Sequence, residues 1–197
     1  MAPRLSETLL DRVRATRTIE PGARLVVMLS GGRDSACLTK LAVDLSAEVT
    51  ALHVNHGLRG AESAVDEAHC RELCAGLGVG LVVEHAGPAA PGNTHAWARD
   101  VRYDAGVALA QRNDAALAVA HTETDQLETI LYRLATSPGR RALLGMAVRR
   151  GRIVRPLLAA RVTRAETEAF CRENGLSWRD DASNLDPSYA RTRVREQ

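Results

Sequence analysis

The sequence lacks the features that would place it in a membrane or in an oxidising compartment. No stretch of its 197 residues is apolar for long enough to cross a bilayer, and residues 1–20 mix charged with apolar side chains where a signal peptide would have an apolar core. Its four cysteines form no C-x-x-C pair, so we expect buried thiols rather than a zinc site or a disulfide framework. These absences predict a cytoplasmic protein with no membrane partner.

Acidic residues are missing from one long segment of the chain. Lys40 is the single lysine, and the formal net charge of +2 by itself says little about a partner. Nine arginines and no acid lie between Arg133 and Arg164. Such a stretch is typical of a surface that binds phosphate, although an arginine-biased chain that merely solvates its surface would look the same.

What the chain does contain is a repeated alternation of short β-branched runs with helical patterns. The four strand–helix units are residues 25–29 with 36–45, 49–54 with 65–77, 80–83 with 97–109, and 116–120 with 127–134. This alternation predicts an α/β fold in which helices cover both faces of a parallel sheet and ligand loops lie at the carboxyl ends of the strands.

The composition changes after Arg155 and Pro156. We therefore expect one main domain over residues 1–158 and a short helical and irregular extension over residues 159–197, where a second module could begin. Within this extension, Thr163 and Glu166 have the spacing of a capping box at the start of a helix.

The first strand leads into the glycine-rich turn Ser30-Gly-Gly-Arg-Asp-Ser35. Without Cβ atoms, Gly31 and Gly32 let backbone amides approach phosphate oxygens, and the following helix adds its partial positive charge. The two serines supply further donors, Ser35 is placed to cap the helix, and Asp34 can hold a magnesium ion. The lysine of a Walker A loop and the G-x-G-x-x-G pattern are absent. The structural alternative is a tight turn with a serine cap.

Polar residues also follow the second and fourth predicted strands. His53 and His56 lie at the end of the second strand, where they could be metal ligands or have a purely structural role. His121 lies at the end of the fourth strand, and Asp125 begins a helix with Glu128 three residues on. This pattern suits an ammonium or a magnesium ion, and it equally suits a capping box that serves only the helix.

Two arginines lie one turn apart in the third predicted helix. Arg99 and Arg102 are neighbours on one helix face, because residues three apart in a helix lie one above the other. They could clamp a phosphate or a carboxylate, or they could belong to a solvated face.

These motifs resemble those of a known family. The segment from Ser30 to Ser35 resembles the signature of PP-loop ATP pyrophosphatases, and the motifs that follow it resemble, within that group, those of tRNA(Ile)-lysidine synthetases. The downstream stretches that carry the resemblance are His53 to Arg59, Arg99 to Tyr103, Ala120 to Thr129, Ser137 to Met146, Arg155 to Leu158, and Asp181 to Arg195. His95 and Thr124 depart from the family pattern, because they stand where a glutamate and an aspartate are usual.

The resemblance implies a five-stranded parallel sheet of the adenine nucleotide alpha hydrolase type and a ligase that uses ATP and Mg²⁺. Such an enzyme adenylates the wobble cytidine of an isoleucine tRNA with a CAU anticodon, and free L-lysine then displaces AMP. A homodimer is a further expectation. The alternatives are another PP-loop tRNA-modifying enzyme, such as a tRNA thiolase, and a non-catalytic module that senses ATP.

The resemblance also assigns roles to individual residues. Catalysis is expected from Asp34, Asp125, His121 and Arg102, with Asp34 as the magnesium ligand. ATP is expected to be bound by Ser30, Gly31, Gly32, Arg33, Asp34, Ser35, His53 and His56. Contacts with lysine or tRNA are expected from Arg99, Glu128, Arg140, Arg141, Arg155, Arg191 and Arg195.

Overall fold

The computed structural model describes residues 5–45, 47–89, 92–136 and 139–179. Its elements are α1 (Leu5–Ala15), β1 (Arg24–Met28), α2 (Arg33–Asp44), β2 (Glu48–Asn55), α3 (Ala61–Leu77), β3 (Gly80–His85), α4 (Thr94–Arg112), β4 (Ala116–Ala118), α5 (Glu123–Thr136), the 3-10 helix η1 (Arg140–Leu144), β5 (Arg149–Arg150), β6 (Ile153–Val154), α6 (Pro156–Ala159) and α7 (Arg164–Glu173). Among the helices in these ranges, none is long and apolar enough to span a membrane.

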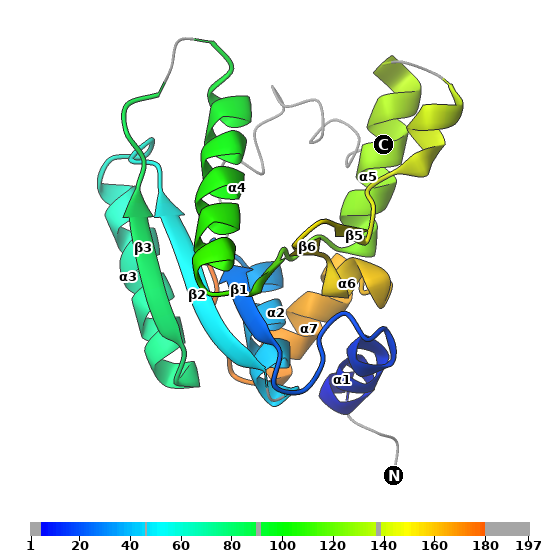
Figure 1. The fold of residues 1–197 in the computed structure, drawn as a ribbon, viewed down its shortest axis with the longest axis horizontal. Helices are drawn as coiled ribbons and strands as arrows, with labels where there is room; N and C mark the ends of the chain where they lie inside the picture. The colour runs from blue at the N-terminus through cyan, green and yellow to red at the C-terminus, as the bar shows by residue number, and fades with distance from the viewer. Residues whose placement is uncertain (1–4, 46, 90–91, 137–138, 180–197) are drawn as a thin grey trace.

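The strands form one sheet in the order β3-β2-β1-β4-β6-β5 (Figure 1). From β1 the chain builds outward to β2 and β3 on one side, and then returns to place β4 on the other side of β1. Ligands of open α/β sheets bind where the strand order reverses in this way, outside the carboxyl ends of the strands. The predicted α/β fold is confirmed, and the gap between the ends of β1 and β4 is the place to look for a site.

The strand count needs a correction. Five strands, β3, β2, β1, β4 and β6, run parallel, and a sixth, β5, pairs antiparallel with β6. Both β5 and β6 are two residues long, and β5 consists of the exposed Arg149 and Arg150. A strand of two residues is too short to produce an apolar run, and β5 is charged as well, so the sequence pattern could not locate either strand.

Helices cover both faces of the sheet, as expected. On one face, α4 packs Leu109 and Ala110 against Val26 and Leu117. Gly106 allows the close approach of α4 to β4, because a Cβ at this position would lie 2.9 Å from Leu117. The opposite face is covered by α1, α2, α3 and α7, whose apolar side chains form the larger core with β1 (Figure 1).

Two of these helices have a bearing on the predicted organisation. The sequence patterns did not predict α1, yet its Leu9 and Val13 are completely buried. Helix α7 lies beyond the expected domain boundary at residue 158, and its Phe170 is 1% exposed in the same core as α2. The predicted capping box of α7 is confirmed, since Thr163 and Glu166 each accept a hydrogen bond from the other's backbone amide.

Candidate active site

The glycine-rich turn connects β1 to α2 at the carboxyl edge of the sheet. Gly31 has a φ of +84°, and a Cβ on it would lie 3.3 Å from Sγ of Cys70 on α3. The backbone amide of Ser30 donates to Oγ of Ser35 at 3.2 Å, and this hydroxyl donates to the carbonyl of Gly32 at 2.8 Å. The turn is therefore closed by its own serine, and a side chain at Gly31 would make a tight contact with Cys70.

The helix cap differs from the prediction. The N-cap of α2 is Gly32, which has an extended backbone and no side-chain cap bond, whereas Ser35 lies within the first turn of the helix. A glycine at the N-cap leaves the first amides of a 12-residue helix uncovered by a side chain. Uncovered amides with the positive end of the helix dipole form an anion site, so this turn fits the phosphates of ATP.

Asp34 lies in the first turn of α2, half-buried beside charged neighbours. Oγ1 of Thr167 on α7 donates to its Oδ1. Nε of Arg33 lies 3.8 Å from the same oxygen, and Nε of Arg164 lies 3.9 Å from Oδ2. Burial raises the pKa of Asp34, the nearby charge of Asp125 adds to the rise, and the hydrogen bond from Thr167 and the two arginines only partly offset it. A carboxylate here can hold Mg²⁺ beside the phosphate site.

Arg33, which was expected to contact ATP, is held from α7. Its Nη1 donates to Oε2 of Glu168 at 2.9 Å. An ion pair to α7 thus holds the glycine-rich turn Ser30–Ser35, which we call the phosphate turn. Helix α7 lies beyond the predicted domain boundary at residue 158.

Asp125 lies at the start of α5, and its carboxylate accepts three hydrogen bonds. Its Oδ2 accepts from the amide of Thr122 at 2.8 Å and from the hydroxyl of Thr122 at 2.9 Å. Its Oδ1 accepts from Nη2 of Arg164 at 2.8 Å. The capping box proposed for Asp125 and Glu128 is therefore corrected: the capping partner of Asp125 is Thr122, and Glu128 is buried with its Oε1 3.0 Å from Nη1 of Arg164.

Arg164 is a residue of this site that the sequence analysis did not single out. It lies at the first position of α7 and reaches three carboxylates, those of Asp34, Asp125 and Glu128. Burial lowers the pKa of Arg164, but the three negative charges outweigh this and raise it. Its amide also donates to Oγ1 of Thr124, the residue that departs from the family pattern, at 3.1 Å. The capping box at Thr163 indicates in the sequence where α7 begins. Nothing in the sequence indicates that Arg164, the next residue, belongs to the site.

His121 follows β4, directly across the reversal point from the phosphate turn. Its Nδ1 accepts a hydrogen bond from Nε of Arg155 at 3.0 Å. Arg155 is 7% exposed, and its Nη1 donates to the carbonyl of Ala147 at 2.7 Å. The structure thus places Arg155 as a support for His121. Because a guanidinium only donates, the neutral imidazole must carry its proton on Nε2.

The two histidines that end β2 have different surroundings. His53 is 6% exposed, with its Nδ1 3.0 Å from the carbonyl oxygen of Leu29 and 3.4 Å from Sγ of Cys70. The His56 ring stands edge-on to Trp97 of α4 at 5.5 Å, and both of its ring nitrogens are buried without a hydrogen-bond partner in the described structure.

Burial, together with the smaller effects of the charges of Arg102 and His53, lowers the pKa of His56 to about 4. His56 is therefore neutral at pH 7, and its donor nitrogen and its acceptor nitrogen both lack a partner among the described residues. In the ranges that the structure describes, no three His, Cys, Asp or Glu side chains could share a metal ion, so the metal alternative for these histidines finds no third ligand.

A pocket of about 550 Å³ lies between α4 and the short strands β5 and β6. Its walls include Arg99, Tyr103, Arg150 and Arg155. The Arg99 guanidinium lies over the Tyr103 ring, 4.8 Å from the centroid. The two arginines predicted to act together on α4 therefore have different surroundings. Arg99 lines this pocket, whereas Arg102 lies near His56.

The arginine-rich segment is mixed in its surroundings. Four of its members make structural contacts: Arg133 with the Gly145 carbonyl, Arg152 with the Ala115 carbonyl, Arg155 with His121, and Arg164 with the three carboxylates. Four others are exposed: Arg140, Arg149, Arg150 and Arg161. Arg141 lies in η1 and its side chain is outside the described part, as are Arg191 and Arg195 altogether.

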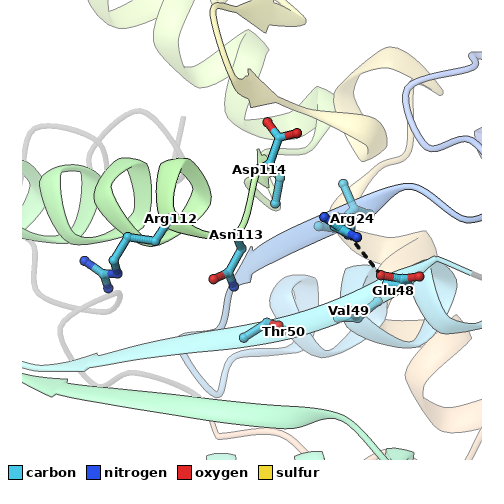
Figure 2. Close-up of a pocket in the computed structure, with 9 residues that line it drawn as sticks. Arg24, Glu48, Val49, Thr50, Arg112, Asn113 and Asp114 are labelled. Atoms are coloured by element: carbon cyan, nitrogen blue, oxygen red, sulfur yellow. Dashed lines mark hydrogen bonds and ion pairs between the residues drawn. The ribbon is translucent and has the colours of Figure 1, made fainter.

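A second pocket, of about 510 Å³, lies at the opposite edge of the sheet (Figure 2). It is lined by the amino-terminal residues of β1 and β2 and by the end of α4, and two of its lining residues form an ion pair, with Nε of Arg24 3.2 Å from Oε2 of Glu48. No motif of the sequence falls here, and the amino edge of a parallel sheet is not where ligands bind in such folds. The chemistry belongs to the carboxyl edge.

The predicted buried thiols are confirmed. Cys37, Cys70, Cys74 and Cys171 are all buried and free. Burial raises the pKa of Cys70 and Cys171 to about 12 and that of Cys74 to about 11, and it raises that of Cys37 well above its usual value. Thiols with such pKa values are not reactive at neutral pH.

The fold and the phosphate turn define a class of protein. A family profile described as a PP-loop domain matches residues 5–197, and the chain belongs to this family. The chain is also similar to curated proteins named tRNA(Ile)-lysidine synthase. That of Pseudomonas fluorescens is 41% identical over 180 residues, which cover 87% of this chain and 40% of the relative. That of a Nostoc species is 37% identical over 195 residues, which cover 94% and 56%. The chain therefore spans about half of the length of these relatives, or less.

Solved structures support the fold. The U34-tRNA thiolase NcsA of Methanococcus maripaludis, with its 4Fe-4S cluster, matches with a TM-score of 0.77 and 16% identity, over 98% of this chain and 70% of that one. The NH3-dependent NAD synthetase of Campylobacter jejuni matches with a TM-score of 0.59 and 15% identity, over 98% and 90%. At such identities the similarity concerns the fold alone.

Proposed function

We propose that this chain is an ATP-dependent ligase that joins free L-lysine to the wobble cytidine of an isoleucine tRNA with a CAU anticodon. The name shared by its curated relatives supports this activity. The observation that carries the proposal is the meeting of two motifs at the reversal point of the sheet. There, the phosphate turn after β1 and the start of α5 after β4 present carboxylates to the same guanidinium.

The phosphate turn would hold the triphosphate of ATP. Backbone amides at Gly31 and Gly32 and the start of α2 can stabilise the charge that develops on pyrophosphate as it leaves. A magnesium ion at Asp34 would neutralise part of the same charge, a contribution of several kcal/mol when it is bound. The neutral His56, whose ring nitrogens are buried and unpartnered, is suited to a polar group of the nucleoside.

The reaction has two steps. The exocyclic oxygen of cytidine attacks the α-phosphorus of ATP, and pyrophosphate leaves. The ε-amine of lysine then attacks the ring carbon that bears this oxygen, AMP leaves, and the amine loses a proton.

We assign the lysine end to the carboxylates at the start of α5. Asp125 and Glu128 offer negative charge to an ammonium, and of Asp125 and His121 we assign the acceptance of its proton to Asp125. The Nδ1 of His121 is already occupied, because it accepts the hydrogen bond from Nε of Arg155. His121 would instead donate a hydrogen bond from Nε2.

The exposed arginines would contact the tRNA backbone. Arg140 begins η1, which packs against α5, and Arg149 and Arg150 form the edge strand β5. The target base belongs to a single-stranded loop from which it can be turned out at low cost. A tRNA substrate would place the protein in the cytoplasm, and a homodimer stays a prediction. We also propose that the catalytic domain extends through α7, since Arg164 and Thr167 contact Asp34.

The two alternative functions, a tRNA thiolase and an ATP-sensing module, require features different from those of a ligase. A tRNA thiolase of the kind expected from the sequence needs an accessible cysteine or a cluster site, whereas the four thiols here are buried and have raised pKa values. A module that only senses ATP would release no pyrophosphate.

The test is pyrophosphate release from ATP, measured with tRNA and lysine each present or omitted. We expect release that requires tRNA, and AMP formation that requires lysine as well. The Asp125→Asn variant should lose AMP formation, because the amide cannot accept the proton of lysine. Near-normal lysine transfer by this variant would remove Asp125 from the mechanism, and no pyrophosphate under any condition would favour the ATP-sensing alternative.

A further inference from the structure

Three carboxylates meet around one guanidinium at the centre of the site. Nη2 of Arg164 lies 2.8 Å from Oδ1 of Asp125, Nη1 lies 3.0 Å from Oε1 of Glu128, and Nε lies 3.9 Å from Oδ2 of Asp34. All three nitrogens of the guanidinium are therefore used, each toward a different carboxylate. The Arg164 side chain is 20% exposed and Glu128 only 8%, so these charges interact with little screening by water.

The three carboxylates come from two elements on opposite sides of the reversal point. Asp34 belongs to α2, which follows β1 and the phosphate turn, whereas Asp125 and Glu128 belong to α5, which follows β4. Arg164 reaches both from a third element, α7. The geometry thus joins the ATP side of the site to the lysine side through one planar cation.

Two other arginines of the site, Arg33 and Arg155, bind other partners. Arg33 lies 3.8 Å from Asp34, but its Nη1 is directed to Glu168 on α7 at 2.9 Å. Arg155 donates to His121 and to the Ala147 carbonyl. Without Arg164, Asp34 and Asp125 would repel each other, since their charges already act on one another in the folded chain.

We propose that Arg164 is a positioning residue that sets the separation between the ATP side and the lysine side of the active site. This inference rests on the proposed function and adds a residue that neither the sequence motifs nor the family resemblance assigned. The role requires a planar fork with several donors, so lysine, a single point charge on a flexible stem, cannot replace it. Arg164 itself need not touch the reacting atoms.

The experiment compares Arg164→Ala, Arg164→Lys and Arg164→Met with the wild-type chain. Pyrophosphate release and lysine incorporation into tRNA are measured separately, and ATP affinity is measured by calorimetry without tRNA. Arg14→Ala is the matched control, because Arg14 forms an exposed ion pair with Asp11 on α1, away from the site. All variants are compared by melting temperature.

We expect the rate of lysine incorporation to fall about 100-fold in each Arg164 variant, since a displacement of about 1 Å in an active site can cost this much. ATP affinity should stay within about threefold of wild type, because backbone amides of the turn hold the triphosphate. Arg14→Ala should behave as wild type. Methylguanidinium, added at concentrations that leave the melting temperature unchanged, should restore activity to Arg164→Ala. It should not do so for Arg164→Met, whose side chain fills the space.

Two results would overturn the inference: an Arg164→Lys variant as active as wild type, or loss of activity that tracks a lowered melting temperature and does not respond to methylguanidinium. Both results are interpretable only if the wild-type chain incorporates lysine, because each compares the activity of a variant with that of the wild type. A wild-type chain without lysine incorporation would instead overturn the proposed function. If the wild-type chain does not incorporate lysine, ATP affinity still tests the inference. An affinity reduced more than tenfold in Arg164→Ala would overturn it, because Arg164 would then be a nucleotide-binding residue.

Discussion

Replacing Gly31 by alanine perturbs the phosphate turn in two ways that the structure separates. The φ of +84° is unfavourable for a residue with a Cβ, at a cost of about 1–2 kcal/mol. The new methyl would also lie 3.3 Å from Sγ of Cys70 and 3.5 Å from the ring of His69, a tight contact that we expect to add about 1 kcal/mol. The sum is a loss of about 2–3 kcal/mol in the free energy of unfolding, from these two terms.

Two other glycines separate the cost of the positive φ from the cost of the steric contact. Gly22 has a φ of +74° with nothing within 4 Å of a new Cβ, so Gly22→Ala should lose only the conformational cost of about 1–2 kcal/mol. Gly32 has an ordinary φ of −77°, and its new Cβ would lie 3.5 Å from Oγ of Ser30. Gly32→Ala should therefore cost at most about 1 kcal/mol in stability, as expected for the N-cap. It should still weaken ATP binding, because the methyl enters the phosphate site.

The assay is urea unfolding, followed by tryptophan fluorescence, together with ATP binding by calorimetry. We expect Gly31→Ala to lose more stability than Gly22→Ala, and Gly32→Ala to lose ATP affinity with little loss of stability. If Gly31→Ala unfolded at the same urea concentration as wild type with an unchanged slope, the turn could not have the backbone described here.

The core and the buried histidine give two further predictions. Phe170→Ala should destabilise the whole domain by about 3–5 kcal/mol in a single urea transition, because Phe170 is 1% exposed in the main core; separate unfolding of α7 would contradict this. His56 has its pKa lowered to about 4 in the folded chain, against about 6.5 in an unfolded one, so the unfolded state binds more protons between these pH values. Stability should fall as pH drops from 6.5 to 4, and His56→Gln should lessen the fall by about 1–2 kcal/mol, with solvent screening allowed for. A pH profile identical to that of wild type would exclude His56 as its source.

The parts of the fold that were predictable from the sequence are those with a local signal. Residues 25–29 and 49–54 are short apolar runs, and the helices after them have apolar residues at helical spacing, so their elements were found within a few residues. The positions of Asp34 and His121 followed from the general rule that strand ends share one edge of a parallel sheet. The phosphate turn was predictable because its backbone, with a φ of +84° at Gly31, favours glycine at that position.

The missed features depend on contacts between distant parts of the chain. The two-residue strand β6 exists because the backbone amides of Leu117 and Val119, in and just after β4, donate to the carbonyls of Arg152 and Val154, and β5 exists because it pairs with β6. Arg164 lies 39 residues from Asp125 and Thr167 lies 133 residues from Asp34, so no spacing rule could pair them. Arg155 resembled a substrate-binding arginine in the sequence, and only its burial beside His121 indicates a supporting role.

The most direct test of the proposed activity is the covalent product. Radiolabelled lysine is incubated with this chain, ATP, Mg²⁺ and an isoleucine tRNA transcript that has a CAU anticodon, in parallel with a transcript in which uridine replaces the wobble cytidine. The proposal predicts label in the cytidine transcript alone, one AMP and one pyrophosphate for each lysine attached, and a mass increase of the cytidine nucleotide. Equal labelling of both transcripts, or consumption of ATP with no lysine attached to RNA, would contradict it.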